Sequence, residues 1–92
     1  MNRIINLTQC PATPEQTADG VFDPNTSDCA ALAELFDFNG ASSTIELMRR
    51  VQAIADIAGR YNCDEAVFSK VPYFWHPLQK AITRKGIMPP IF

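Results

Sequence analysis

One apolar stripe at helical spacing runs through residues 47–61 and constrains the fold most. Its members recur at intervals of three or four residues: Leu47, Val51, Ile54, Ala58 and Tyr61, widened by Met48, Ala55 and Ile57. Ser43 followed by Glu46 is a capping-box pattern, which marks the start of a helix. The sequence therefore predicts an amphipathic helix from about 43 that frays near 59–62.

Two shorter helices are predicted before this one. Thr13, Pro14 and Gln16 form a helix-start signal, and Gly20 ends that helix after about two turns. Residues 21–25 are predicted to be a loop because they contain Asp-Pro-Asn. A second helix is expected from residue 27 or 28 to about 38. Its inward positions are Cys29, Leu32, Ala33 and Phe36.

Short β-branched or aromatic runs at 4–7 and 66–68 predict two strands. Pro77 suits the first position of a fourth helix that ends near Lys85, with Leu78, Ala81 and Ile82 on its inner side. The tail 87–92 contains two consecutive prolines, so it is expected to form an edge strand or a packed extended segment.

Strands that alternate with helices favour a single α/β domain over residues 1–92. We expect a sheet of two or three strands covered by three or four helices. Parallel pairing is possible because helices supply the crossovers, and an α+β arrangement with an antiparallel edge fits almost as well. At 92 residues, such a domain has a thin core.

The sequence contains little that predicts catalysis or a cofactor. Cys10, Cys29 and Cys63 lack the close spacing of zinc ligands and are expected to be small buried apolar residues. His76 is the one histidine, and it is interpreted as a packing or helix-start residue. There is no EF-hand loop and no glycine-rich phosphate loop. We therefore expect no metal, no cofactor and no enzymatic activity.

Charge is sorted along the chain. Residues 1–46 sum to −6 and residues 47–92 to +4, within a total of −2. A basic half favours encounters with phosphates or acidic protein surfaces. No segment has the length or composition of a membrane span or a signal peptide, which predicts a cytoplasmic protein without a membrane partner.

A partner-binding surface is predicted around the fourth helix. Lys80 and Arg84 are four residues apart and share one helix face. Nearby aromatic side chains are typical interface anchors, although at least one of residues 73–75 is expected to be core. The predicted partner-binding residues are Arg49, Arg50, Tyr73, Trp75, Lys80, Arg84 and Lys85.

Two segments carry a family resemblance. Residues 4–9 with 12–16, and residues 72–74 with 77–82 and 86–87, resemble the opening and closing units of a family of short phage and prophage proteins. This chain has Cys10 where that family commonly has histidine. Its length and opening also resemble the small anti-CRISPR proteins that act on type I-F systems.

The resemblance implies a non-enzymatic inhibitor in the infected bacterial cell. Such a protein would bind the multi-subunit, crRNA-guided surveillance complex and block recognition of target DNA. Its basic half would meet either the phosphates of the crRNA or acidic surfaces of the protein subunits. It would need no small-molecule ligand. Two alternatives stay open: a small phage regulatory module that binds nucleic acid or a host protein directly, and an enzyme centred on Cys10, Cys63 or His76.

Overall fold

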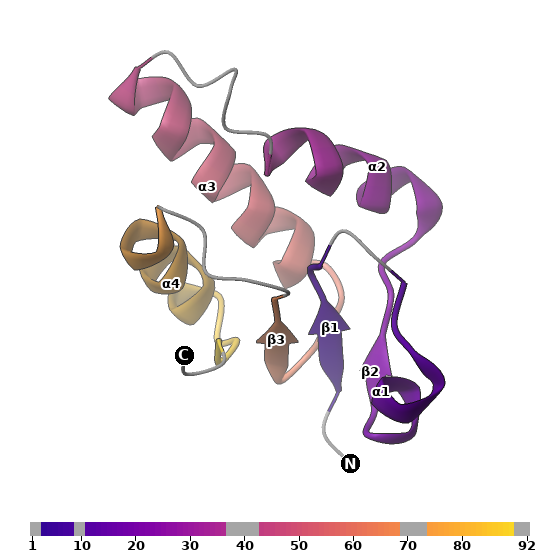
Figure 1. Cartoon of the computed structure of the whole chain (residues 1–92). Helices are drawn as coiled ribbons and strands as arrows, with labels where there is room; N and C mark the ends of the chain where they lie inside the picture. Colours follow the sequence, from indigo (N-terminus) through magenta and orange to yellow (C-terminus); the bar gives the residue numbers. More distant parts are fainter. Residues whose placement is uncertain (1–2, 9–10, 37–42, 69–73, 90–92) are drawn as a thin grey trace.

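The computed structural model describes residues 3–8, 11–36, 43–68 and 74–89 (Figure 1). Along the chain the elements are β1 (Ile4–Asn6), α1 (Pro14–Ala18), β2 (Val21–Phe22), α2 (Thr26–Leu35), α3 (Thr44–Gly59), β3 (Glu65–Val67) and α4 (Trp75–Arg84).

The sheet is parallel, which confirms the α/β prediction. Its strands lie in the order β2-β1-β3, with Ile4 of the central strand opposite both Val21 and Glu65. Met88 makes a further parallel bridge to Glu65. Every strand pairing among the described residues is parallel, so the antiparallel edge that was considered is not found there. Only the part of the predicted tail up to Pro89 can be placed.

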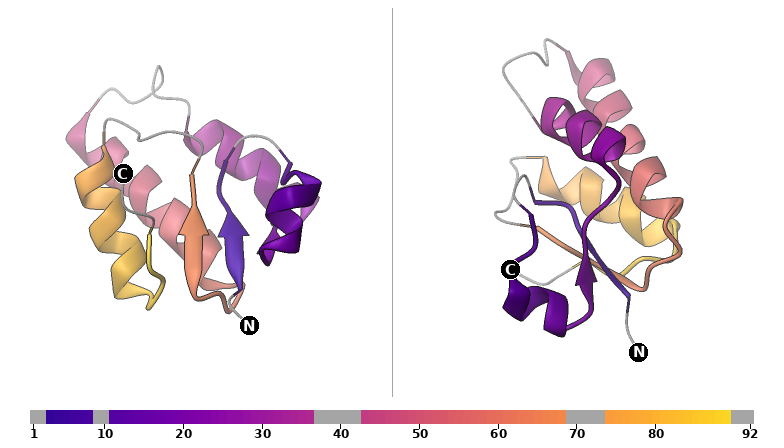
Figure 2. Two further views of the ribbon diagram at one scale, coloured as in Figure 1. Left: turned by 60° about the horizontal axis from the view of Figure 1, so that its bottom comes forward. Right: turned by 90° about the vertical axis from the view of Figure 1, so that its right-hand side faces the viewer.

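The two faces of the sheet have different covers. The register puts Ile5, Phe22 and Ala66 on one face, and these pack into the core with α2, α3 and α4. Ile4, Val21 and the buried Asn6 lie on the opposite face. The connection from β1 to β2 leads to one edge of the sheet, and the connection from β2 to β3 leads back past β1 to the other edge. Right-handed crossovers therefore place α1 on the face away from α3 and α4 (Figure 2).

Helix α3 forms as its stripe predicts. The Ser43 hydroxyl accepts a hydrogen bond from Glu46 N at 3.2 Å and caps the helix. The buried positions are Val51, Ile54, Ala55, Ile57 and Ala58. Met48 was expected to widen this stripe, which was wrong: its side chain is 48% exposed. The stripe is narrower at its start because the first turns of α3 extend beyond the core.

Helix α2 begins at Thr26, one or two residues earlier than predicted, because the Asn25 side chain caps it by accepting from Asp28 N. Leu32 is its buried residue, and Ala31, Leu35 and Phe36 pack against the core. Cys29 and Ala33, predicted to face inward, are exposed. The inner side of α2 is therefore rotated from the prediction. Its predicted last residues, 37 and 38, lie outside the described part.

Two further boundaries differ from the sequence prediction. Val21 and Phe22 form strand β2 instead of a loop, because β1 offers them a hydrogen-bonding partner. Helix α4 begins at Trp75, two residues before Pro77. Pro77 is therefore third in the helix, where it removes no intrahelical hydrogen bond because the first N–H groups of a helix have no partner within it. Its predicted inner positions Leu78, Ala81 and Ile82 are all buried.

Candidate functional site

Two of the predicted basic residues meet in a groove between α3 and α4. Lys80 and Arg84 line it from α4 together with His76, and Met48 and Gln52 line it from α3. Buried Val51 and Ala81 form its floor, and its volume is about 260 Å³. We call this hollow the α3–α4 groove. It combines an apolar base with a cationic rim.

The rim cations are not neutralised by the described part of the protein. Three ion pairs occur among the described residues, and none of them involves Lys80 or Arg84. Neither acid of α3, Glu46 or Asp56, lines the groove. Both cations on α4 are therefore available to an acidic partner.

Lys85, the third base predicted near the end of α4, forms an ion pair within the protein. Its Nζ lies 2.9 Å from Asp56 Oδ1, and Gln52 Nε2 donates to the same oxygen at 2.9 Å. These hydrogen bonds hold the pKa of Asp56 below its ordinary value, with Lys85 the larger cause. Lys85 thus links α4 to α3 at the end of the groove and is less free to meet a partner.

Arg49 and Arg50 do not extend the groove. Arg50 contacts the Glu46 carboxylate at 3.4 Å and donates to the Glu34 carbonyl at 3.0 Å, which ties α3 to α2. Arg49 is exposed and lines a separate hollow between these helices. The structure therefore divides the predicted basic surface into two regions.

The aromatic residues that the structure describes here belong to the core. Phe74 is buried, and the half-buried Trp75 lies edge-on to Phe68 with ring centroids 5.4 Å apart. Phe36 stacks on Phe74 from α2. Buried Phe74 confirms that at least one residue of 73–75 is core. Trp75 packs against the core with its side chain half-buried, and its use as an interface anchor stays a prediction. Tyr73, the other predicted aromatic contact, lies outside the described residues.

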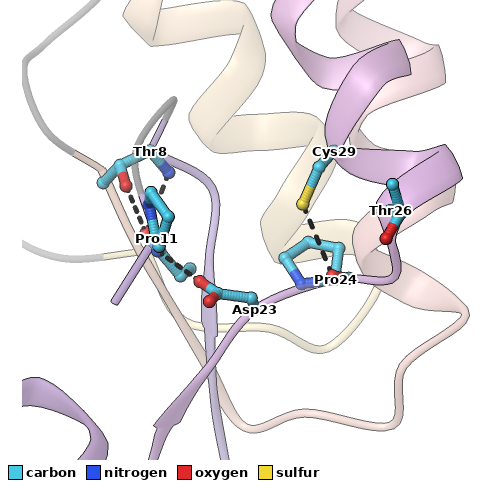
Figure 3. Close-up of a pocket in the computed structure, with 7 residues that line it drawn as sticks. Thr8, Pro11, Asp23, Pro24, Thr26 and Cys29 are labelled. Carbon is cyan, nitrogen blue, oxygen red and sulfur yellow. Dashed lines mark hydrogen bonds between the residues drawn. The ribbon is translucent and has the colours of Figure 1, made fainter. Parts of the chain in front are cut away.

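A further hollow, which sequence reasoning missed, lies at the carboxyl ends of β1 and β2 (Figure 3). Its volume is about 350 Å³, and we call it the carboxyl-end pocket. Thr8 and Pro11 lie on one side of Asp23, while Thr26 and Cys29 of α2 lie on the other (Figure 3). The remaining lining residues are Asn6 and Pro24.

Hydrogen bonds fix the polar side of this pocket. The buried Asn6 donates from Nδ2 to Asp23 Oδ1 at 2.7 Å, and its Oδ1 accepts from the Thr8 N–H and hydroxyl. Ala12 N donates to both Asp23 oxygens, at 3.0 and 3.3 Å. The Asp23 carboxylate is thereby held at the mouth of the pocket while its side chain remains exposed. The only sequence signal was the Asp-Pro-Asn turn after two apolar residues.

The surroundings of both described cysteines disfavour the thiolate form. Desolvation, followed by the charges of Asp23 and Asp28, raises the pKa of the Cys29 thiol. Burial is also the main cause that raises the pKa of Cys63, whose thiol donates to the Ala58 carbonyl at 3.6 Å. Contrary to the sequence prediction, Cys29 is exposed and Cys63 only half-buried; Cys10 is outside the described part. No group of three possible metal ligands occurs among the described residues.

Comparisons with protein-family models, curated proteins and solved structures gave no match. Among the described residues, no helix has both the length and the apolar character needed to cross a membrane.

Proposed function

We propose that this protein acts by occupancy, docking the α3–α4 groove onto an acidic surface of a larger assembly. The observation that carries the proposal is the unneutralised pair Lys80 and Arg84 on the rim of an apolar-floored groove. The apolar floor favours a protein partner, because buried apolar contacts surrounded by polar ones are typical of protein interfaces.

Free nucleic acid suits this surface less well. Two rim cations neutralise few phosphates, which gives weak and strongly salt-dependent binding on its own. The acids of the N-terminal half would oppose any wider contact with a polyanion, since the whole chain carries −2. Binding to a protein surface, alone or beside bound RNA, requires less total positive charge than binding to free nucleic acid does.

The resemblance to type I-F anti-CRISPR proteins supplies a specific partner for this proposal. The assembly is then the crRNA-guided surveillance complex, and the protein blocks target DNA by covering the surface on which hybridisation begins. Occupancy needs no catalytic residue, which agrees with the raised pKa values of Cys29 and Cys63.

The test is a gel shift of target DNA by the purified type I-F complex, with and without this protein added first. Loss of the shift at near-equimolar protein is expected for the wild type. Lys80→Glu should abolish the inhibition. Arg49→Glu is the matched control, because it changes the net charge equally on an exposed residue outside the groove.

Three results would overturn the proposal. An unchanged DNA shift, with no co-elution of the two components, removes the type I-F complex as the partner. A shift of naked DNA or RNA by this protein alone assigns it instead to the nucleic-acid-binding alternative. Equal loss of inhibition in both variants would remove the groove as the docking site.

A further inference from the structure

The α3–α4 groove continues along α3 into an exposed apolar surface. Met48 lines the groove with its side chain 48% exposed, and Ile45, one turn earlier, is 68% exposed. Residues 45, 48 and 52 follow helical spacing, so these two apolar side chains lie in line with Gln52 of the groove. We call Ile45 and Met48 the apolar row. The fold therefore leaves two large apolar side chains exposed on one wall of a groove.

The opposite wall carries a row of basic side chains. His76, Lys80 and Arg84 recur every four residues along α4, and all three line the groove. We call these three residues the basic row. Four residues advance a helix by about 6 Å, so the basic row repeats at that distance over about 12 Å. Among the described residues, Lys80 and Arg84 form no ion pair, so carboxylates of a partner can reach both.

Helices α3 and α4 run side by side in the same direction along the groove. At one end, Met48 and His76 line it together. Farther along both helices, Lys85 Nζ reaches Asp56 Oδ1 at 2.9 Å. The apolar row and the basic row therefore form two walls that follow the groove, with a length of about two helical turns.

These two walls match an acidic amphipathic helix. Carboxylates placed four residues apart on a helix repeat at about 6 Å, which is the repeat of the basic row. Apolar side chains on the neighbouring face of that helix would contact Ile45, Met48 and the floor of buried Val51 and Ala81. An extended segment fits less well, because strand addition needs an exposed sheet edge and this groove lies between two helices.

We propose that the α3–α4 groove binds an amphipathic helix of a partner protein, with its acidic side on α4 and its apolar side on α3. Amphipathic helices bind grooves in this manner elsewhere, by laying their apolar face between the walls. Met48 suits this role because the flexible side chain of methionine adapts to different apolar surfaces. The proposal rests on the proposed function, which makes this groove the docking site, and adds the kind of segment that docks there.

The test is a ¹H–¹⁵N NMR titration of the protein with synthetic peptides. One alanine-based peptide of about 18 residues carries leucines on one face and glutamates at four-residue intervals beside them. A second peptide has the same composition in an order without helical periodicity. The periodic peptide is expected to shift the amide signals of Met48, Gln52 and Lys80 and to bind about tenfold tighter than the second. Equal binding of both peptides, or no shifts with the periodic peptide at millimolar concentration, overturns the proposal.

A single-stranded RNA of uridines is the third probe. It is expected to bind more weakly than the periodic peptide at about 0.15 M salt, because the few cations of the basic row neutralise few phosphates. RNA that binds as tightly as the periodic peptide would assign the basic row to phosphates and overturn the proposal.

A protein variant isolates the contribution of the apolar row. Met48→Gln keeps the length and the helix propensity of the side chain but removes its apolar surface, so the periodic peptide should bind about tenfold more weakly. Met88→Gln is the matched control, because Met88 is 64% exposed and does not line the groove. Unchanged binding in Met48→Gln, or equal weakening in both variants, would contradict an apolar contact on α3.

Inhibition of the type I-F complex separates this outcome from that of the proposed function. Met48→Gln should require about tenfold more protein than the wild type to abolish the DNA shift, whereas Met88→Gln should match the wild type. If Lys80→Glu loses inhibition and Met48→Gln retains it fully, the groove stays the docking site and the amphipathic helix is overturned. If the wild type does not inhibit, the type I-F complex fails as the partner, and the peptide titration still decides what the groove binds.

Discussion

At the scale of single residues, Tyr61 connects segments that are distant in sequence. Its hydroxyl accepts from Asn25 N at 2.9 Å and donates to an Asp28 carboxylate oxygen. Arg60 contacts the other Asp28 oxygen at 3.0 Å. The end of α3 is thereby fixed to the start of α2. Partial burial, and then the bond to Asp28, raises the pKa of Tyr61 above its ordinary value of 10.0.

Tyr61→Phe is predicted to lower the free energy of unfolding by about 1.5–3 kcal/mol, because a hydrogen bond to a charged group is lost. Arg60→Gln is the control: its side chain is 63% exposed, so its ion pair should contribute under about 1 kcal/mol. Urea unfolding at neutral pH measures both. A larger loss in Arg60→Gln would contradict this ranking.

The same tyrosine predicts a pH dependence. Its raised pKa means that the folded state binds the phenolic proton more tightly than the unfolded chain does. The stabilisation is therefore fully present below pH 10.0 and is lost as the pH rises toward the folded pKa. Unfolding curves across this alkaline range should fall more steeply for the wild type than for Tyr61→Phe, and parallel curves would contradict the assignment.

Gly86 adopts a left-handed backbone conformation that favours glycine. It follows α4 with φ of +82°, and a Cβ built there would meet nothing within 4 Å. Gly86→Ala should therefore cost about 1 kcal/mol from backbone strain alone. Gly86→Asn should cost less, because asparagine tolerates this conformation better. Thermal unfolding compares the two, and an alanine variant as stable as the wild type would show that the strain is absent.

At the scale of elements, α3 and α4 build the groove by packing together. Leu78 is fully buried between α4 and the core. Leu78→Ala should lower the free energy of unfolding by about 2–5 kcal/mol through the cavity it leaves. Gln79→Ala should cost far less, because Gln79, the next residue in α4, is only half-buried. Urea unfolding tests the difference, and similar costs would mean that α4 is rotated from the orientation described.

How well each element could be predicted from sequence depends on where its determinants lie. Helices α1 and α3 carry their caps within a few residues, so Thr13 and Ser43 were sufficient to place their starts. Strand β2 has two residues and no alternation, and it exists because Ile4 and Ile5 pair with it. Met48 was misassigned because periodicity identifies a helix face but not where the core beneath it ends.

At the scale of the whole molecule, the α3–α4 groove and the carboxyl-end pocket also differ in how much of each depends on local sequence and how much on contacts between distant segments. Lys80 and Arg84 share a face by helical spacing alone, so this half of the groove was predictable. Gln52 and Met48 join them only because α3 packs beside α4. The carboxyl-end pocket depends on two parallel strand ends meeting, which no local pattern around Thr8 records.

The fold places two bases of α4 and two acids at α1 on opposite sides of the molecule. Helix α4, with Lys80 and Arg84, lies at one side of the molecule, and α1, with Glu15 and Asp19 nearby, lies at the other (Figures 1 and 2). The longest dimension is 39 Å. The Debye length is about 30 Å at 0.01 M salt and about 8 Å at 0.15 M. At low salt, charges across most of the molecule therefore act on a partner at the groove, whereas at physiological salt only the charges close to the groove do.

This separation predicts different salt dependences for two charge reversals. Measured on immobilised type I-F complex, Lys80→Glu should slow association at both ionic strengths, because Lys80 lies on the groove rim. Asp19→Lys, at the distant end, should speed association a few-fold at about 0.01 M salt and leave it unchanged at about 0.15 M. An effect of Asp19→Lys that persists at the higher salt would mean that the acidic end touches the partner, so the groove would not be the sole docking surface.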